Sequence, residues 1–113
     1  MVQTVGPEAV VLIDHATAPV TANVPELDMR GRYSLTLTIA GPFTGTVTFE
    51  GTIDHQFWGA VELRELGAKN STGTSTTAAG AWVSQDHYPL AAFRCSVPTL
   101  TAGDVTVTAL RGA

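Results

Sequence analysis

Hydrophobic and polar residues alternate along much of this chain, and the alternation is clearest over residues 32–40. There Leu35, Leu37 and Ile39 fall on one side of an extended chain, while serine and threonine occupy the positions between them. Successive side chains of a β-strand point to opposite faces of the sheet, so this pattern predicts a strand that buries one face. Such half-buried strands are typical of antiparallel sheets.

Further segments repeat this pattern, and breaks containing glycine, proline, aspartate or asparagine separate them. The expected strands are residues 10–13, 32–40, 46–53, 57–66, 81–84, 91–97 and 104–110. About seven to eight short strands with frequent turns are typical of an antiparallel β-sandwich. The fold class that we predict is therefore all-β, as a sandwich of jelly-roll or Ig-like type.

For some segments the sequence indicates which residues face inward, and for others it leaves two structures open. Over 46–53 the alternation places Val47, Phe49 and Ile53 on the inner face, and Gly51 indicates a bulge. Residues 60–66 also tolerate a short helix, and residues 67–80 are small and polar enough for a loop or a weak edge strand.

The first 28 residues follow a different pattern. Three prolines surround the apolar run at residues 10–13. Proline has no backbone N–H to donate to a sheet, so it favours edge strands and extended segments. We therefore expect an extended N-terminal arm with one short strand over residues 1–28, followed by one β-domain over residues 29–113.

The composition excludes several classes of protein. Only 14% of the residues are charged, whereas about a quarter is usual. The 10 acidic and 6 basic residues give a net charge of −4, and a nucleic-acid-binding protein would usually present a basic face. The longest apolar run, residues 9–13, is far shorter than the roughly 20 residues of a membrane-spanning helix. The first residues also lack the basic start of a secretory signal. We expect folding in a cytoplasm and no nucleic-acid or membrane partner.

The sequence offers little catalytic chemistry. It contains no glycine-rich phosphate loop, nucleophile elbow or paired cysteine motif. Cys95 is the single cysteine, and it shares a predicted strand face with Phe93 and Val97, which indicates a buried thiol. We therefore expect neither enzymatic activity nor a cofactor.

Each of the three histidines follows an aspartate, in the pairs Asp14-His15, Asp54-His55 and Asp86-His87. Imidazole and carboxylate groups are metal ligands, so the pairs could contribute to a metal site. Aspartate also ends strands and occupies turns, and neighbouring strand residues point to opposite faces, which weakens a shared site. A turn role is the favoured interpretation, and a pH-sensitive contact is the third. We assign no metal ligands.

The aromatic residues are candidates for contacts with other molecules. Phe57 and Trp58 are adjacent, so only one of them can face the core of a strand-built domain. Trp82 and Tyr88 bracket a short expected strand and its turn. An exposed aromatic side chain can anchor a protein interface or stack on a sugar. We expect Trp82 to fill the core, while Trp58 fits the core and the surface equally well.

Several segments resemble small β-sandwich virion structural proteins of tailed bacteriophages. The segments that carry the resemblance are RYSLTLTIAG at 32–41, TGTVTFEGTID at 44–54 with Trp58, LAAFRCSV at 90–97 and GDVTVT at 103–108. The similarity covers roughly residues 28–111. At the hairpin tip, Asp54-His55-Gln56-Phe57 replaces the Asp-Gly turn that is common in such proteins, which indicates a contact specific to this chain.

This resemblance implies a capsid decoration or cement protein, located in the virion. It implies that the chain binds the major capsid protein and stabilises adjacent capsomers, as a homo-oligomer that is expected to be a trimer. It implies no catalytic residues. The contact candidates are residues 1–28 together with Phe43, His55, Phe57, Trp58 and Tyr88. The alternative is a tail or fibre module that binds carbohydrate through Trp58, Trp82 and Tyr88.

Overall fold

The computed structural model describes residues 8–31, 34–67, 71–84 and 90–112, and these residues form antiparallel β-sheets without a helix. The described strands are β1 (Glu8–Ala16), β2 (Leu27–Asp28), β3 (Ser34–Ala40), β4 (Phe43–Thr52), β5 (Gly59–Ala60), β6 (Leu63–Glu65), β7 (Thr72–Gly73), β8 (Ser75–Thr76), β9 (Gly80–Ser84), β10 (Ala92–Gly103) and β11 (Val105–Gly112). The all-β prediction is confirmed. The described residues contain no helix of the length and hydrophobicity needed to cross a bilayer.

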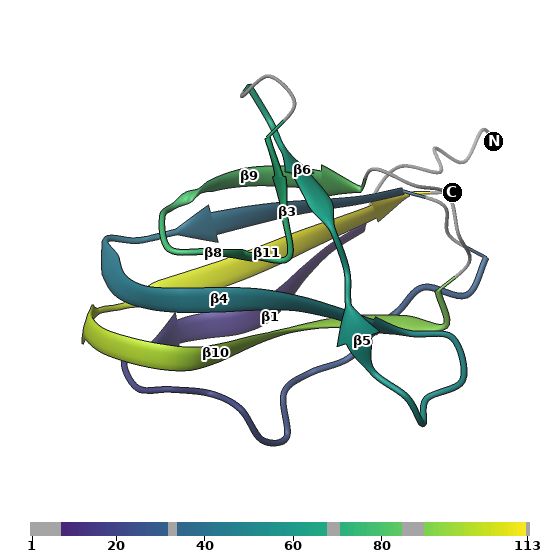
Figure 1. Cartoon of the computed structure of the whole chain (residues 1–113), viewed down its shortest axis with the longest axis horizontal. Coiled ribbons are helices and arrows are strands. Elements are labelled where there is room, and N and C mark those ends of the chain that lie inside the picture. The colour runs from purple at the N-terminus through teal and green to yellow at the C-terminus, as the bar shows by residue number, and fades with distance from the viewer. Residues whose placement is uncertain (1–7, 32–33, 68–70, 85–89, 113) are drawn as a thin grey trace, which may run out of the picture.

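The described strands form two sheets (Figure 1). One has the order β1-β11-β3-β9-β6-β7, and the other has the order β2-β10-β4-β5, with β8 paired to β4. The pairing of β4 with β10 runs the length of both strands, from Thr52 beside Ala92 to Phe43 beside Gly103. These two strands therefore connect opposite ends of the molecule, and the candidate site lies at the Thr52 end.

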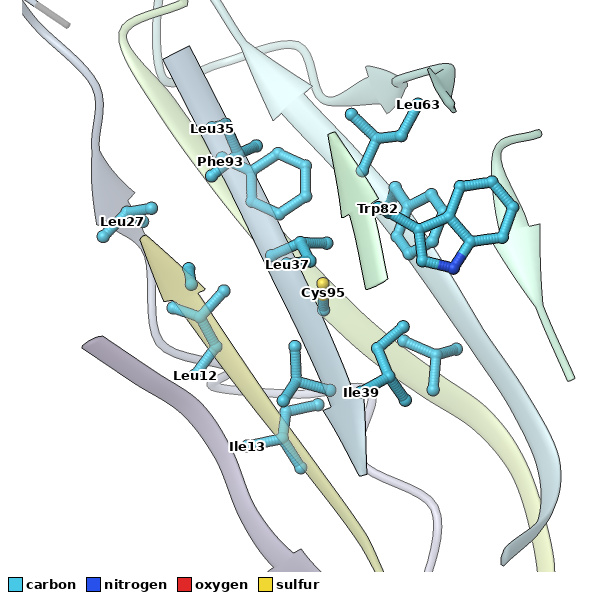
Figure 2. Packing of buried hydrophobic residues seen from close by; sticks show 14 of the residues in the cluster. Leu12, Ile13, Leu27, Leu35, Leu37, Ile39, Leu63, Trp82, Phe93 and Cys95 are labelled. Atoms are coloured by element: carbon cyan, nitrogen blue, oxygen red, sulfur yellow. The ribbon is translucent and has the colours of Figure 1, made fainter. Parts of the chain in front are cut away.

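The two sheets enclose one hydrophobic core (Figure 2). Leu35, Leu37 and Ile39 are all buried, as their alternation predicts. The ring of Phe49 on β4 meets the ring of Trp82 on β9 with their centres 5.3 Å apart, so the two sheets are in direct contact. Tilted aromatic pairs at this spacing are favourable. The prediction that Trp82 belongs to the core is confirmed.

Short strands account for most of the difference from the expected count of seven to eight. β2, β5, β7 and β8 have two residues each, which is too short for a period of two to be recognised. The expected strand at 57–66 is divided into β5 and β6, and neither part is helical. Residues 72–76 provide β7 and β8, so the described part of the 67–80 segment adds edge strands.

Two details of the predicted strands are wrong. Ile53 is exposed and not inward-facing, because β4 ends at Thr52 and a turn follows. Gly51 is no bulge, since it pairs in regular register with Phe93. A Cβ on Gly51 would lie 2.7 Å from the Val61 side chain, so close packing explains the glycine.

Residues 98–103, expected as a connection, continue strand β10. Pro98 is accommodated at a register shift between Ser96 and Thr99, where no N–H is needed for the regular ladder. A second shift lies between Leu100 and Ala102.

The segment expected as an arm contributes two of the strands. β1 pairs with β11 and buries Leu12 and Ile13, and β2 pairs with β10. Between them, Val20 forms an isolated bridge with Val97. Residues 1–7 lie outside the described residues. The division of the chain at residue 28 stays a prediction.

Candidate functional site

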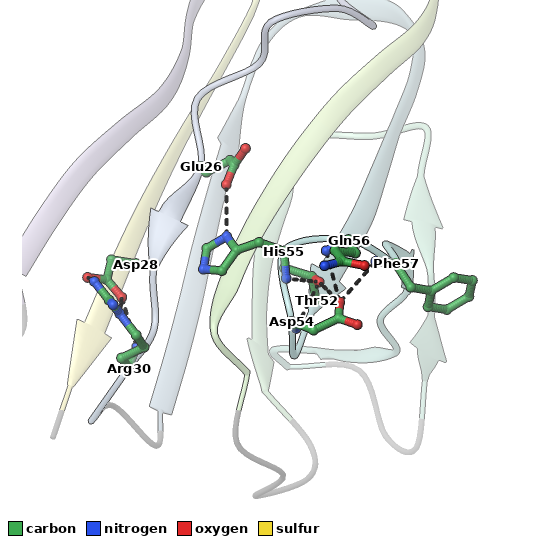
Figure 3. Close-up of polar contacts among 8 residues, drawn as sticks. All are labelled: Glu26, Asp28, Arg30, Thr52, Asp54, His55, Gln56 and Phe57. Atoms are coloured by element: carbon green, nitrogen blue, oxygen red, sulfur yellow. Dashed lines mark hydrogen bonds and ion pairs between the residues drawn. The ribbon is translucent and has the colours of Figure 1, made fainter.

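The turn that follows β4, residues 52–57, is organised by two side chains (Figure 3). The buried hydroxyl of Thr52 accepts hydrogen bonds from the backbone N–H groups of Asp54 and His55, at 3.3 and 2.9 Å. The Asp54 carboxylate accepts from the backbone N–H groups of Gln56 and Phe57, both at 2.9 Å, and from the Thr52 hydroxyl. Short polar side chains stabilise turns in this way. We call residues 52–57 the tip turn.

These hydrogen bonds also fix the charge of the turn. The N–H groups of Phe57 and Gln56 stabilise the carboxylate form of Asp54 and lower its pKa below the ordinary aspartate value. His55 has a φ of 62°, a left-handed conformation that residues other than glycine seldom adopt. A network of this kind restricts the backbone, so the Cα–Cβ bonds of the turn residues point in defined directions.

The tip turn presents two large hydrophobic side chains to solvent. Ile53 is 72% exposed and Phe57 is 75% exposed. Beside them lies a shallow, mainly apolar depression of about 220 Å³. The residues that line the depression are Gly51, Thr52, Ile53, Phe57, Gly59, Ala60, Val61 and Leu90. Exposed apolar surface beside a depression is typical of a surface that contacts another molecule.

Charged residues lie on the opposite side of the tip turn from Phe57 (Figure 3). The Nδ1 atom of His55 lies 3.5 Å from a carboxylate oxygen of Glu26. Further along, the Arg30 guanidinium forms a two-bond contact with the Asp28 carboxylate and lowers the pKa of that group. These contacts are exposed to solvent and contribute little to stability. They give the site one apolar side and one polar side.

Trp58, next to the tip turn, is half-buried beneath an arginine. The Arg94 guanidinium lies 4.0 Å from the centre of the Trp58 ring, and its Nε donates to the Glu50 carboxylate at 3.0 Å. One face of the Trp58 ring is thus occupied by a cation–π contact. Since Trp82 is buried as well, the described tryptophans do not form an open platform for stacking on sugars.

The structure brings some of the expected contact residues together and separates others. His55, Phe57 and Trp58 lie at one end of β4, whereas Phe43 lies at its other end. Phe43 packs partly against the core and lines a second shallow depression, with Pro42, Thr44, Ala102 and Gly103. Tyr88 lies outside the described residues. The contact roles of all five residues stay predictions.

The described aspartate–histidine pairs sit in turns and irregular strand positions. His15 lies in the irregular part of β1 with a φ of 48°, and His55 lies in the tip turn. Asp86-His87 lies outside the described residues. Within the ranges that the structure describes, no group of three or more histidine, cysteine or acidic residues could hold a metal ion. Asp54-His55 fits the turn interpretation, whereas Asp14-His15 lies within strand β1, close to its end. Cys95 is buried, as expected.

Sequence reasoning missed Ile53 and Leu90 as parts of the site. A signal for Ile53 was present, because Ile53 directly precedes Asp54, where the sequence favours a turn. For Leu90 there was no such signal, since its place beside Gly51 depends on the β4–β10 register.

The overall fold has counterparts among solved structures. No protein-family model and no curated protein matches the chain. The SPBc2 prophage-derived protein YomS superimposes with a TM-score of 0.82 at 22% identity, over 100% of this chain and 99% of that one. The PBSX exported protein XepA superimposes with a TM-score of 0.86 at 17% identity, over 100% of this chain and 40% of that one. The chain thus has the fold of YomS and of a part of XepA.

Proposed function

We propose that this chain is a phage-associated binding protein without catalytic activity, and that it docks on another protein through the tip turn. The observation that carries this proposal is the pair of exposed hydrophobic side chains, Ile53 and Phe57, held by the hydrogen bonds of Thr52 and Asp54 beside an apolar depression. A rigid apolar contact loses little conformational entropy on binding, which favours specific docking. Because one of the matched folds is prophage-derived, a phage role is the natural setting.

Within this role, we propose capsid decoration in the virion. The partner would be the major capsid protein, and several copies of the chain would bind at symmetric positions of the head. The support is the resemblance of residues 28–111 to small virion proteins and the low charge of the chain, 14% of residues. A surface with few charges packs closely against neighbours without the cost of removing charges from water.

Co-sedimentation with phage heads that lack this protein tests the proposal. Purified wild-type chain should pellet with the heads, whereas Ile53→Ser and Phe57→Ser should each reduce binding about tenfold or more, as expected for anchor residues. The matched control is Leu66→Ser, which alters a side chain that is 61% exposed and follows β6 of the other sheet. The control should bind like wild type.

Two results would contradict the proposal in different ways. If the wild-type chain stays in the supernatant with intact heads, capsid decoration is wrong, and a role away from the head agrees better with the description of XepA as exported. If the chain pellets but all three variants bind alike, the tip turn is not the contact surface.

A further inference from the structure

Strand β1 leaves one long edge of the six-stranded sheet without a neighbouring strand. It pairs with β11 on one side, and no backbone hydrogen bond joins its other side to a described residue. The opposite end of this sheet is β7, and the second sheet ends in β2 and β5, all of two residues. β2 covers only Ala92 and Phe93 of β10, but the uncovered residues 98–103 of β10 include Pro98 and two register shifts. Within the part of the chain that the structure describes, β1, with nine residues, is therefore the longest strand at the end of a sheet.

Residues 9–11 of this edge lack the features that usually prevent strand pairing, whereas the later part of β1 contains two register shifts and Asp14. Natural edge strands carry lysines, prolines or bulges that block another strand. Residues 9–13 read Ala-Val-Val-Leu-Ile, with no charge and no proline, and Val11 is 52% exposed. The register shifts of β1 begin after Val11, so residues 8–11 form a regular ladder with β11. The N-terminal half of the edge is thus open to a further strand.

We propose that two copies of this chain pair antiparallel through β1, which joins their six-stranded sheets across a twofold axis. A strand added here must itself be apolar, uncharged and free on one side. Residues 9–13 of β1 in a second copy meet these three conditions, whereas the other edge strands have two residues each and the outer side of β10 contains Pro98. Pairing of the same strand in both copies is the arrangement that a twofold axis produces.

The alternation of side chains selects the register of this contact. Opposite residues of an antiparallel pair point to the same face of the sheet. Ala9 and Val11 are exposed, whereas Val10 packs against the core. We expect the register that sets Val10 of one copy opposite Val10 of the other, which places Ala9 opposite Val11. Core-facing residues then meet core-facing residues, exposed residues meet exposed residues, and no two charged residues lie opposite each other. A contact this short is smaller than the roughly 1,200–2,000 Å² of stable interfaces, so we expect micromolar association.

Sedimentation velocity over a concentration series tests the contact. Wild-type chain should form a reversible dimer, in place of the trimer that the virion resemblance implies. Val11→Lys adds one charge per copy at the contact and should raise the dissociation constant about tenfold. The two lysines would lie diagonally across the strand pair, where long side chains still reach each other and their like charges repel. Leu66→Lys is the matched control, because it adds the same charge to an exposed side chain that follows β6 and lies outside both β1 and the tip turn. It should dimerise like wild type.

A cross-link then tests the register. Ala9→Cys and Val11→Cys, mixed in equal amounts under mild oxidation, should form a disulfide-linked pair, because their Cα atoms would be within disulfide range. Val11→Cys alone should cross-link much less, since its two copies would lie diagonally. Cys95 is buried and does not compete.

A wild-type chain that stays monomeric at high concentration, or a dimer that Val11→Lys and Leu66→Lys weaken equally, would overturn the proposal. So would a mixture of the two cysteine variants that yields no more product than either alone. Because the variants at Val11 leave the tip turn intact, a failure here is independent of the capsid experiment.

Discussion

Replacing Gly103 by alanine should be strongly destabilising, although it adds a single methyl group. Gly103 ends β10 with a φ of 79°, where it approaches the start of β4. A Cβ at this position would overlap the carbonyl oxygen of Pro42 and lie 2.8 Å from the Cα of Phe43. Both are backbone atoms, so a change of side-chain rotamer cannot relieve the overlap.

Two costs contribute to the expected loss of stability in Gly103→Ala. An alanine in the left-handed conformation costs about 1–2 kcal/mol. Overlap in a packed region costs about 1–3 kcal/mol more, because β4 and β10 must move apart locally. The free energy of unfolding should therefore fall by about 2–5 kcal/mol, a large part of the ~5–15 kcal/mol that is typical of a domain.

Substitutions at two other glycines measure the conformational cost and the overlap cost separately. Gly67 has a φ of 89°, but no described atom lies within 4 Å of the position that an added methyl group would take, so Gly67→Ala should show the conformational cost alone. Gly45 has no left-handed φ, but a Cβ there would overlap the Thr99 carbonyl oxygen and lie 2.9 Å from the Leu100 Cα. Gly45→Ala should therefore show the overlap cost alone.

Urea unfolding followed by tryptophan fluorescence measures these differences, because Trp82 is buried in the folded state. The slope with urea should stay constant, so that changes in midpoint report stability. The reasoning is refuted if Gly103→Ala is no less stable than Gly67→Ala, since the close approach of β4 and β10 would then be wrong.

Three further predictions concern the tip turn and the core. Thr52→Val keeps the volume of the side chain but leaves two backbone N–H groups of the turn without their acceptor, and thermal unfolding should show a loss of about 1–2 kcal/mol; an unchanged midpoint would contradict the role of this hydroxyl. The pKa of Asp54 is lowered by the N–H groups of Phe57 and Gln56, so its contribution is present above the unfolded-state pKa of about 4 and is lost as the pH falls through the lower folded-state value. Asp54→Asn should therefore be less stable than wild type at pH 7, with a difference that narrows toward pH 2, and a pH-independent difference would refute this. Burial raises the pKa of the Cys95 thiol, so its reaction with a thiol reagent should be about a hundredfold slower in buffer than in urea, and equal rates would show that it is accessible.

The alternating strands were predictable because their pattern follows directly from the geometry of a half-buried sheet. Leu35, Leu37 and Ile39 are buried, and the threonines between them are exposed or half-buried. The two-residue strands were not predictable, because their pairing is decided by neighbours distant in sequence. The expected jelly-roll or Ig-like form of the sandwich stays a prediction.

Proline predicted strand ends less reliably than the alternation of hydrophobic and polar residues predicted strands. Pro98 predicted the end of a strand, yet β10 continues past it, because a register shift removes the need for its N–H. The local sequence around Pro98 carries no sign of this shift, which depends on how β4 lies against β10.

The candidate site was predictable in part. The aromatic pair Phe57 and Trp58 marked the correct region, since two adjacent large side chains cannot both face one core. Their separate environments were not predictable, because the Arg94 that covers Trp58 is distant in the sequence and reaches it through the β4–β10 pairing. For the hydrogen bonds of Thr52 and Asp54, the sequence indicated only that a strand ends and that an aspartate suited to a turn follows.

The position of β11 determines when this domain can fold during synthesis. β11, residues 105–112, lies between β1 and β3, so these two earlier strands have no contact with each other through the sheet until it is added. When a ribosome has completed residues 1–100, β1 and β3 have been synthesised but β11, which pairs with both, has not. We therefore expect the nascent chain to expose the apolar faces of β1 and β3 until β11 is released, and protection by chaperones would matter most during that interval.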